Sequence, residues 1–582
     1  MGTYSIPSIR AKILIITIVF LRGYSAQASD YLFRNGRTEY SIVLPAEASH
    51  SERTAALELQ KYVQEISGVL LNIVDGTVSE GKRIYLGYHP EIKAYRDIKR
   101  YNEEDEGFTY RKVGYDLIIC GGRHRGTMYG VFSFLENELG VRWYTPKETV
   151  VPKRKRYNIP YLDHSETPTM KVRFTNYNET TAGGTRIEWS AHNKENMKFV
   201  GQYNEYGDLY GFNRSHTMGI FVPSSEYFGT HPEYFAFKGG KRIPNGQLCL
   251  SNPDVLQICI AEMKTDIETR PTAYFHSLSQ IDSYDFCECD ECKAIEAKYG
   301  GHAGLIIWFV NQVADAIKDD YPKALINTYA YQYSVAPPKG IVPRDNVVVI
   351  LCTTGCCFAH PFSDKCCDYP YRNSILMDNI EGWSKICKNF FVWSYIVNFK
   401  HPLAPYPNFQ VLGPNILTLA EYNVFGMFEG ARYEAPGGSF SELRNWIALK
   451  LMWNSTLDVD SLAKDFIYGY YGEAAKYIWK YYTITQALVK PENHFYIWLE
   501  CDDKIFTDEY VNQSMSLLNR AMRVVDDGES KSRVERVFMQ ILYLKCLRNV
   551  QEAKMDGTRQ MLIELLNKQD VGVKADLFTV NE

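Results

Sequence analysis

The chain has 582 residues, of which 45% are hydrophobic and 23% charged, so it has a globular composition and is too long for one compact core. We expect two or three domains. The formal net charge is −5 and no long basic run is present, which argues against nucleic acid as a partner because a phosphate backbone favours a basic surface. Most of the 43 tyrosines are expected to pack in cores, and some can line a sugar-binding groove.

The N-terminus has the pattern of an export signal. Arg10 and Lys12 precede the apolar run Ile13–Leu21, and Ala26-Gln27-Ala28 fits a small-residue cleavage site. The run is shorter than a bilayer crossing requires, so a short membrane anchor is the less favoured alternative. We predict a signal peptide over residues 1–28 and a mature protein that is periplasmic or secreted, without stable membrane insertion.

Residues 30–160 mix strand-like and helix-like patterns. Apolar runs bounded by turn residues predict strands at Ser41–Pro45, Arg83–Tyr88 and Tyr115–Cys120. Apolar residues recur at helical spacing over Ser49–Ser67, and Gly126–Leu139 predicts a second helix. We therefore expect a small α/β domain in this region.

Residues 165–438 alternate strands and helices. The predicted strands are Lys171–Asn176, Leu209–Arg214, Gln247–Leu250, Ala273–Gln280, Leu325–Tyr331, Asn346–Thr353, Phe390–Tyr395 and Val424–Glu429. Helical patterns separate most of them, for example at Val255–Thr269, Leu305–Asp319 and Asn408–Tyr422. Eight such units predict a (β/α)8 TIM-like barrel.

Residues 439–582 show one amphipathic stretch after another. Leu443, Trp446, Ile447 and Leu451 lie on one helical face, and further helical patterns continue towards the end of the chain. We predict a helical C-terminal region that covers the barrel or mediates association into a homo-oligomer.

A predicted core strand runs directly into an acid and then into a group of thiols. Residues 273–280 are followed by Asp282 and then by Cys287, Cys289 and Cys292 at C-x-C-x-x-C spacing. Three thiols supply three soft ligands, whereas structural zinc takes four. The fourth could come from a later loop that contains Cys352, Cys356, Cys357, His360, Cys366 and Cys367. Disulfide bonds, which an exported protein can form, and free thiols are the alternatives to a metal.

The C-terminal ends of the strands form the reactive face of a barrel. The side chains expected there are rich in aromatic rings, amides and cations, which is the composition of a sugar-binding site. The candidate substrate-binding residues are Arg214, His216, Asn252, Tyr329, Tyr331, His360, Trp393, Tyr395 and Arg432, with Asn176 and Glu179 at the end of the first strand.

Two acids directly follow predicted core strands, Asp282 after the fourth and Glu429 at the end of the eighth. Glycoside hydrolysis generally uses two carboxyl groups, one of which protonates the leaving oxygen while the other acts as base or nucleophile. Strands four and eight lie on opposite sides of a barrel, so we expect a wide gap between the two catalytic side chains. In the alternative, one acid only forms an ion pair with Arg214, Arg432 or Lys400.

Several stretches together resemble a known family. They are Arg125–Val131, Phe134–Glu136, Gly140–Tyr144, His231–Phe235, Asp282 with Cys287, Glu288, Cys289 and Cys292, and Leu449–Asn454. In these the chain resembles the domain of unknown function 4838 family of bacterial exported proteins, which carries an N-terminal domain like that of alpha-glucuronidases and beta-hexosaminidases. The resemblance implies a carbohydrate-active barrel, most simply a glycoside hydrolase. Because Ser283 follows Asp282, the Asp-Glu dyad of beta-hexosaminidases is not expected.

Three functions compete. The first is an exported glycoside hydrolase with Asp282 and Glu429 as its catalytic pair, possible alpha-glucuronidase-like specificity and no required cofactor. An alpha-glucuronidase needs a cation for the substrate carboxylate, which Arg214, Arg432 or Lys400 could supply. The second is a barrel that binds glycans without cleaving them and uses its cysteines for structure, and the third is a metal-dependent hydrolase.

Overall fold

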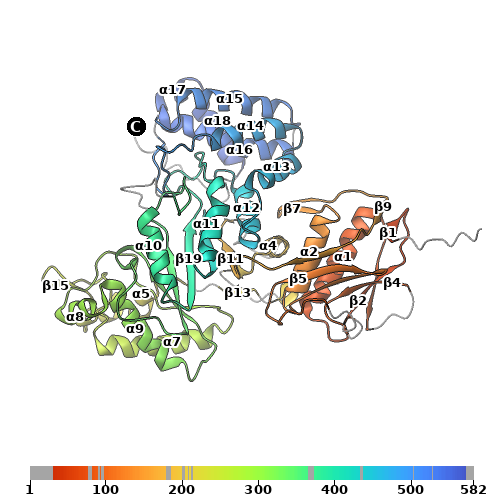
Figure 1. Ribbon diagram of the computed structural model, residues 1–582. Coiled ribbons are helices and arrows are strands. Elements are labelled where there is room, and N and C mark those ends of the chain that lie inside the picture. Colours follow the sequence, from red (N-terminus) through yellow and green to blue (C-terminus); the bar gives the residue numbers. More distant parts are fainter. Residues whose placement is uncertain are drawn as a thin grey trace, which may run out of the picture.

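A computed structural model of the protein describes residues 30–76, 81–89, 92, 97–178, 185–198, 204–207, 209–211, 214–364, 373–432, 437–501, 504–526, 528–569 and 571. The predicted signal peptide lies outside these residues, as do Glu179, Cys366 and Cys367. Figure 1 shows an N-terminal sheet unit, a central parallel sheet with a lobe beside it, and a group of helices at the C-terminal end.

The N-terminal unit is a mixed sheet of six strands in the order β10-β5-β6-β4-β2-β3, with two helices. Its strands are β2 (Tyr40–Leu44), β3 (Asn72–Asp75), β4 (Lys82–Leu86), β5 (Phe108–Val113), β6 (Asp116–Gly121) and β10 (Asp163–Glu166), and its helices are α1 (His50–Ser67) and α2 (Gly126–Asn137). Two strand pairs flank the sheet, β1 (Tyr31–Arg34) with β9 (Arg156–Asn158) and β7 (Arg142–Thr145) with β8 (Glu148–Val150). The strands and helices predicted in this region are all present.

Local sequence explains why α1 begins and ends where it does. The Ser49 side chain accepts a hydrogen bond from the backbone of Glu52, and the Glu52 carboxylate accepts one from the backbone of Ser49, which is a capping box. The helix ends at Gly68, whose φ of 78° lies in the left-handed region that glycine adopts without strain.

The central feature is a curled parallel sheet with strand order β11-β20-β19-β18-β17-β16. Its strands are β11 (Val172–Thr175), β16 (His276–Ser277), β17 (Ile326–Ala330), β18 (Val347–Cys352), β19 (Asn389–Tyr395) and β20 (Val424–Gly430). Their inner side chains form one buried cluster that includes Phe174, Phe275, Ile350, Phe391 and Phe428. Helices cover the outer face, so both faces of the sheet are buried, as is usual for parallel strands.

Two short strands lie between the edges of this sheet. The backbone of β11 is hydrogen-bonded to Asn196, which directly precedes β12 (Met197–Lys198), and β12 pairs in parallel with β13 (Tyr210–Gly211). Gly211 in turn forms a parallel bridge with Ala273, just before β16. A continuous series of backbone contacts therefore leads from one edge strand to the other.

One predicted strand does not belong to the parallel sheet. Gln247–Leu250 was predicted as the third strand, but Leu248 forms an isolated antiparallel bridge with Phe235. The Gln247 side chain anchors this segment instead, because its amide donates to the Ile281 carbonyl at 2.6 Å and its oxygen accepts from the Ile281 N–H at 2.9 Å. The prediction of a core strand here is wrong, and β12, which is only two residues long, was not predicted.

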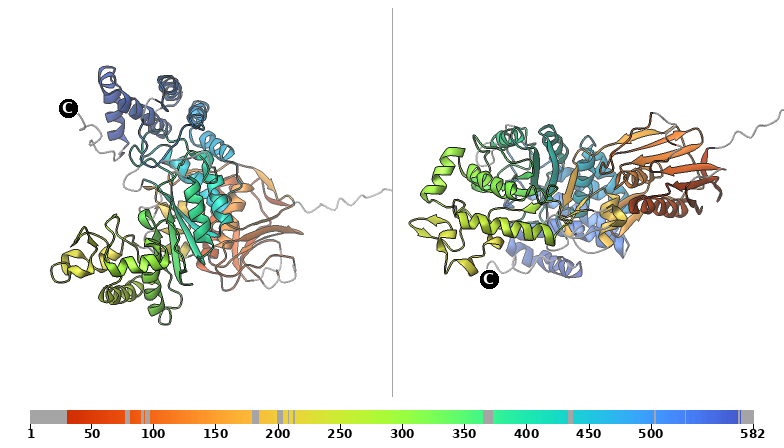
Figure 2. Two further views of the ribbon diagram at one scale, coloured as in Figure 1. Left: turned by 60° about the vertical axis from the view of Figure 1, so that its left-hand side comes forward. Right: turned by 90° about the horizontal axis from the view of Figure 1, so that it is seen from below.

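Two segments, one between β13 and β16 and one between β16 and β17, form a lobe that extends from the sheet on the side away from the N-terminal unit (Figure 2). It contains α5 (Met218–Phe221), α6 (Ser224–Tyr227), β14 (Phe237–Lys238), β15 (Lys241–Arg242), α7 (Pro253–Thr269), α8 (Asp290–Tyr299) and α9 (His302–Ile317). A separate buried cluster holds the lobe together and includes Cys249, Cys287, Cys289 and Cys292.

The remaining helices cover the sheet or follow it. They are α4 (Thr185–His192), α10 (Asn373–Ser384), α11 (Phe409–Glu421), α12 (Ser441–Trp453), α13 (Val459–Tyr470), α14 (Ala475–Gln486), α15 (Asp508–Arg523), α16 (Glu529–Arg548), α17 (Val550–Met555) and α18 (Thr558–Lys568). Helices α13 to α18 gather at one end of the molecule. Within the described parts of the chain, none of the helices combines the length and apolar character needed to cross a membrane.

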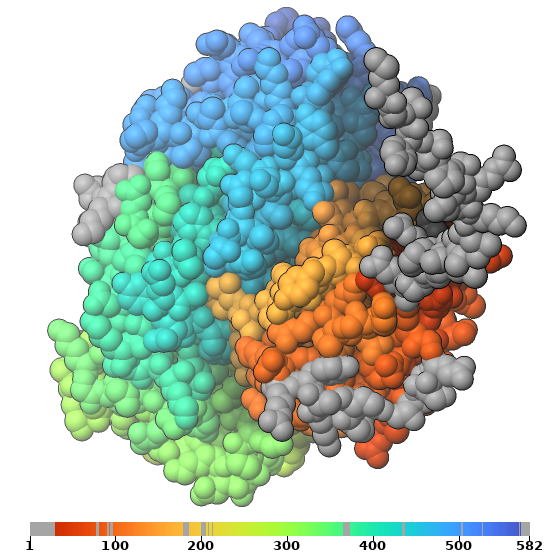
Figure 3. Space-filling model, turned by 45° about the vertical axis from the view of Figure 1, so that its right-hand side comes forward, coloured from red at the N-terminus to blue at the C-terminus, as the bar shows by residue number. Residues whose placement is uncertain are grey.

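The N-terminal unit is joined to the rest of the protein by buried contacts, and Figure 3 shows it (red to orange) packed against the central part. One apolar cluster runs from β1 through α12 to α18. Within this interface Glu106 accepts hydrogen bonds from Arg125 and Arg173, both at 2.5 Å. Burial by itself raises the pKa of Glu106, but the charges of Arg173 and Arg125 outweigh it and hold the pKa below its ordinary value. A second pair, Glu136 with Lys450 at 2.5 Å, links α2 to α12.

Candidate active site

Asp282 lies at the C-terminal side of β16, where the neighbouring strand β17 also ends. Its Oδ1 accepts a hydrogen bond from the Tyr331 hydroxyl at 3.1 Å and from the Gln332 amide at 2.9 Å. Asp282 is otherwise exposed. Gln332 has a φ of 50°, a left-handed conformation that is uncommon for a residue other than glycine and is concentrated at functional sites. Two adjacent strands thus hold one accessible carboxylate in place.

Aromatic side chains extend from Asp282 across the ends of the strands. The His216 ring lies 6.4 Å from that of Tyr331 and 5.8 Å from that of Tyr329. Tyr329 is 5.8 Å from Trp393, which is 6.4 Å from Tyr395. The structure therefore brings together five of the predicted substrate-binding residues with Asp282. We call these six residues the mouth cluster.

The backbone of His216 is held in an unusual conformation. Its φ is 57°, its N–H donates to the Ser279 hydroxyl at 2.9 Å, and its Nδ1 donates to the Gln280 carbonyl at 2.8 Å. Both partners belong to the segment that leads from β16 to Asp282. The histidine ring is therefore positioned by the same segment that positions the acid.

Several buried polar atoms near this cluster have no hydrogen-bond partner among the described residues. They include the side-chain oxygens of Gln280, Tyr329, Gln332 and Thr353. Buried polar groups in proteins are nearly always paired with protein or ordered water, so ordered water is the simplest partner for atoms of this kind. Gln280 precedes Asp282 by two residues, Gln332 contacts it, and Thr353 follows β18.

Asp282 also influences titratable groups around it. Burial raises the pKa of the Cys352 thiol, and the negative charge of Asp282 raises it further. Burial and then Asp282 likewise raise the pKa of Tyr331. At neutral pH these groups stay protonated, so Cys352 is not a thiolate nucleophile.

Glu429 has a different environment. It follows Phe428, whose ring belongs to the inner cluster of the sheet, whereas Met427 packs with the outer helices. Because side chains alternate along a strand, Glu429 shares the outer face with Met427. Burial raises its pKa to about 8, against the opposing effects of the Ser394 hydroxyl and the Arg444 charge, and its Oε2 accepts no hydrogen bond from the described residues. It is a buried, neutral carboxyl between the sheet and α12.

The other predicted site residues lie elsewhere. Asn252 caps α7, its Oδ1 accepting from the Asp254 N–H at 2.8 Å. His360 contacts the Cys357 thiol at 3.5 Å and the Lys490 carbonyl at 3.1 Å, against the C-terminal region. Arg432 donates to the Gly437 carbonyl at 3.1 Å. Arg214 is exposed near His216 in the sequence, and Lys400 forms an ion pair with Glu500.

The thiol cluster has a member that was not predicted. Cys249 joins Cys287, Cys289 and Cys292, and the four Sγ atoms lie within 4.8 Å of one another. The expected fourth ligand from the later cysteine-containing loop is not found among the described residues, because that loop packs against the C-terminal region, where Cys357 meets His360. None of the described cysteines forms a disulfide bond.

Sequence reasoning missed Gln332 and Gln280 as well as Cys249. Gln280 is the last residue of a predicted strand and Gln332 directly follows another, so reading every residue at or next to a strand end would have found them. Cys249 gave no such signal, because its contact with the later cysteines is made only in the folded protein.

A pocket of about 350 Å³ lies at the other end of the sheet. It is lined by residues of the N-terminal unit, such as Glu104, and by Lys171 and Phe425, near the starts of β11 and β20. In parallel α/β sheets, ligands bind at the carboxyl ends of the strands. We therefore place the candidate site at the mouth cluster rather than in this pocket.

Solved structures with a similar fold are glycoside hydrolases. A family GH115 4-O-methyl-alpha-glucuronidase, BtGH115A, described as specific for decorated arabinogalactans, aligns with a TM-score of 0.60 and 12% identity, over 91% of this chain and 76% of that one. A family 89 glycoside hydrolase from Clostridium perfringens, solved with 2-acetamido-1,2-dideoxynojirmycin, aligns with a TM-score of 0.51 and 10% identity, over 89% and 65% of the two chains. At this identity the likeness establishes a glycosidase-like fold and nothing finer.

The sequence profile of the family described as domain of unknown function (DUF4838) matches residues 143–483. This is more than half of the chain, and the protein belongs to that family, as its motifs predicted. No curated protein matches it in sequence.

Proposed function

We propose that the protein is an exported glycoside hydrolase that acts on glycan or polysaccharide fragments, with Asp282 as its general acid. The observation that carries the proposal is the mouth cluster, in which an accessible carboxylate is fixed by Tyr331 and Gln332 beside several aromatic rings. Aromatic faces of this kind pack on the CH faces of sugar rings.

The cleavage chemistry requires a proton for the leaving oxygen and a second group on the other side of the bond. Asp282 is accessible to substrate and so can serve as the donor. Glu429, the predicted partner, holds a proton at neutral pH because of its raised pKa of about 8, but its buried carboxyl lies on the outer face of β20. Its catalytic role stays a prediction, and the glutamine variant described in the Discussion tests it.

We also propose that eight strands close into a (β/α)8 barrel, in which β12, which was not predicted, is the second strand and β13 takes the third place in the ring instead of residues 247–250. The support is the series of contacts from β11 through Asn196, β12 and β13 to Ala273. In such a ring the ends of β16 to β19, which carry the mouth cluster, border a shared opening.

For the substrate we propose a glucuronide, in line with the GH115 enzyme whose fold is similar. The exposed Arg214, two residues before His216, would bind the substrate carboxylate. An Arg214→Ala variant should then raise KM for an aryl glucuronide by about ten- to hundredfold while leaving KM for the matching neutral glucoside unchanged. Equal effects on both substrates would argue against a glucuronide site.

The principal experiment measures hydrolysis of a panel of aryl glycosides, glucuronides included, by the wild type and Asp282→Asn. We expect a fall in kcat/KM of at least about a hundredfold. Asp285→Asn is the matched control, because Asp285 lies in the same loop but forms an ion pair with Lys238 at 3.0 Å. Full activity of Asp282→Asn on a cleaved substrate would reject Asp282 as the acid.

The alternative is a barrel that binds glycans without cleaving them. The position of Glu429 favours this alternative. Asp282 lies among the aromatic side chains of the mouth cluster, whereas Glu429 is buried on the outer face of β20 and does not join it there as a second carboxylate. Saturable glycan binding by calorimetry, without product from any glycoside, would support this alternative. Export and self-association through the C-terminal helices also remain proposals, to be checked by N-terminal sequencing of the mature protein and by sedimentation.

A further inference from the structure

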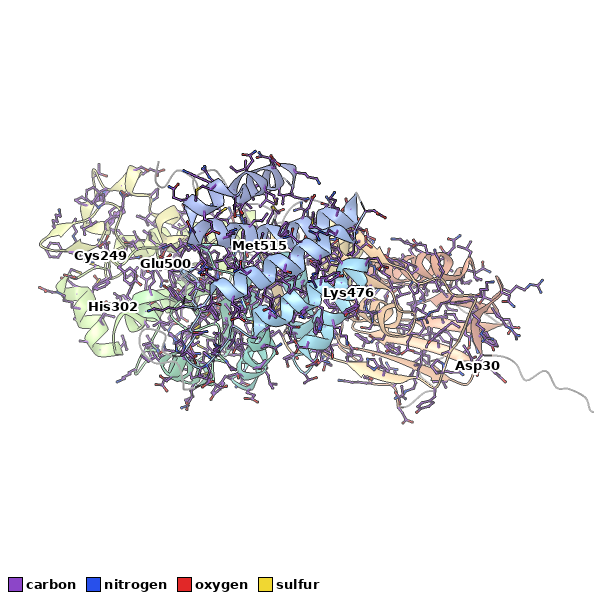
Figure 4. The ribbon with its side chains drawn as sticks, turned by 90° about the horizontal axis from the view of Figure 1, so that it is seen from above. Asp30, Cys249, His302, Lys476, Glu500 and Met515 are labelled. Carbon is purple, nitrogen blue, oxygen red and sulfur yellow. The ribbon has the colours of Figure 1, made fainter. Side chains whose placement is uncertain are left out.

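Four cysteines from two distant segments converge in the lobe. Cys249 lies between Leu248 and the start of α7, and the other three follow Asp282 in the chain. All four side chains are buried, and Figure 4 labels Cys249 in the lobe, at the opposite end of the molecule from Asp30. The distances between their sulfur atoms indicate which kind of site they can form.

The distances fit a tetrahedral metal site. Zinc–sulfur bonds of about 2.3 Å in a tetrahedron place the sulfur atoms about 3.8 Å apart. The Sγ atom of Cys249 lies 3.7 Å from that of Cys289 and 4.0 Å from that of Cys292, and all four lie within 4.8 Å of one another. A disulfide would bring one pair to about 2 Å and would not require the four to be mutually close.

The surroundings suit negatively charged thiolates. The backbone N–H of Phe237 donates to the Cys287 sulfur at 3.3 Å, and Arg242 lies 4.0 Å from the same atom. The Ser251 hydroxyl is 3.3 Å from the sulfur of Cys292. Hydrogen bonds and a cation of this kind stabilise metal-bound sulfur and orient the ligands.

The local backbone also matches a metal-binding element. Cys289 is the N-cap of α8 and its side chain makes no cap hydrogen bond, so its sulfur is available for another role. Cys292 lies in the first turn of the same helix, where the two sulfurs of a C-x-x-C pair can reach one ion.

We propose that Cys249, Cys287, Cys289 and Cys292 bind one Zn²⁺ ion as a structural site. On binding, the four thiols release four protons, and the site carries a net charge of −2 that Arg242 and the surrounding N–H groups partly offset. No coordination position remains for water, so the ion has a structural role rather than a catalytic one.

The site would hold both ends of the segment that carries Asp282. Cys287 follows Asp282 by five residues, and Gln247, two residues before Cys249, is hydrogen-bonded to Ile281 on the other side. Zinc would therefore fix the loop that presents the acid. This consequence concerns the position of the loop and holds whether or not the protein cleaves glycosides.

The first experiment measures the metal content of the full-length purified protein by mass spectrometry after dialysis against a weak chelator. We expect one zinc per chain in the wild type and at most about a tenth of that in Cys249→Ser and Cys292→Ser, since three ligands bind zinc far more weakly than four. Cys259→Ser is the control, because Cys259 is a buried thiol of α7 outside the cluster, and it should keep its zinc.

A second measurement covers the case in which the serine variants do not fold. Zinc is removed from the wild type, cobalt(II) is added, and the visible spectrum is recorded; we expect the intense bands of a tetrahedral thiolate complex. Hydrogen exchange of residues 281–289 should speed up in the metal-free protein and slow again with zinc. Metal-free protein with four free thiols and no cobalt bands, or two disulfides among these cysteines by peptide mapping, would overturn the proposal.

Discussion

The Glu429→Gln substitution separates a structural carboxyl from a catalytic one. Glutamine has nearly the same shape as protonated glutamic acid but cannot ionise. If Glu429 is a neutral side chain buried between β20 and α12, the substitution should leave the fold intact and remove the cost of keeping a titratable group there.

The size of the effect on the free energy of unfolding follows from the difference between the pKa of Glu429 in the folded and unfolded states. The pKa rises from 4.5 to about 8 on folding, so the folded state binds the proton more tightly than the unfolded state. The stability that this carboxyl contributes is fully present below pH 4.5 and is lost as the pH rises through 8. Compared with a protein whose side chain at this position cannot ionise, the wild type should have a free energy of unfolding that is lower by about 1 kcal/mol at pH 5, about 3 kcal/mol at pH 7 and about 5 kcal/mol at pH 9.

The assay compares urea unfolding of the wild type and Glu429→Gln at these three pH values. We expect the variant to be the more stable protein, with an advantage that grows with pH and activity that stays within about threefold of the wild type. Glu421→Gln, an exposed substitution at the end of α11, is the control and should change stability by less than about 0.5 kcal/mol at each pH.

Two results would refute this reasoning. A variant that is less stable, most of all at high pH, would mean that Glu429 is ionised and paired in the folded protein. A variant of unchanged stability that loses activity more than a hundredfold would instead place its carboxyl in the reaction, as the sequence predicted.

Three further outcomes follow from the same structure. Glu106→Gln should lower the free energy of unfolding by about 3–5 kcal/mol in denaturant titrations, because it leaves Arg125 and Arg173 buried without their counter-charge, whereas the exposed Glu421→Gln should not. Tyr331→Phe should reduce kcat/KM by about ten- to hundredfold through the lost hydrogen bond to Asp282, with an unchanged unfolding midpoint, and an equal loss of stability would count against a positioning role. Gly122→Ala should destabilise the protein by at least about 1–3 kcal/mol in thermal unfolding, because the added Cβ would lie 1.7 Å from the Asp105 carbonyl oxygen, while Gly229→Ala has open space around it and should be tolerated.

Sequence patterns located the elements that carry strong local signals. The first helix was predicted from apolar residues that recur at helical spacing, and the structure adds the capping by Ser49, Glu52 and Gly68. Among the core strands, β17 contains Asn327 and Thr328, whereas β18 is a continuous apolar run. Residues 247–250 gave the same apolar signal but pair locally with Phe235, a choice made by tertiary contacts. Strand β12 is too short to show any periodicity.

The candidate site was predictable only in part, for a physical reason. Asp282 and its aromatic neighbours could be predicted because they lie at strand ends, which can be located without knowing the face of the strand on which each side chain lies. The face of β20 on which Glu429 lies could not be read, because both faces of a buried parallel strand are apolar and the sequence shows no alternation. Convergence of Cys249 with the later thiols likewise depends on a fold that brings distant segments together.

The apolar cluster that extends from β1 to α18 has a bearing on how this protein can be dissected. The family segment begins at Trp143, whose ring is stacked 4.3 Å from His192 and whose indole N–H donates to Tyr62 in α1. A shortened chain that starts there would cut through a shared interior and remove Phe108 and Glu106, which contact Trp453 and Arg173. The segment that matches the family, residues 143–483, therefore lacks part of the interior that its own residues share with the N-terminal unit, and shortened chains should retain residues from about 30 onward.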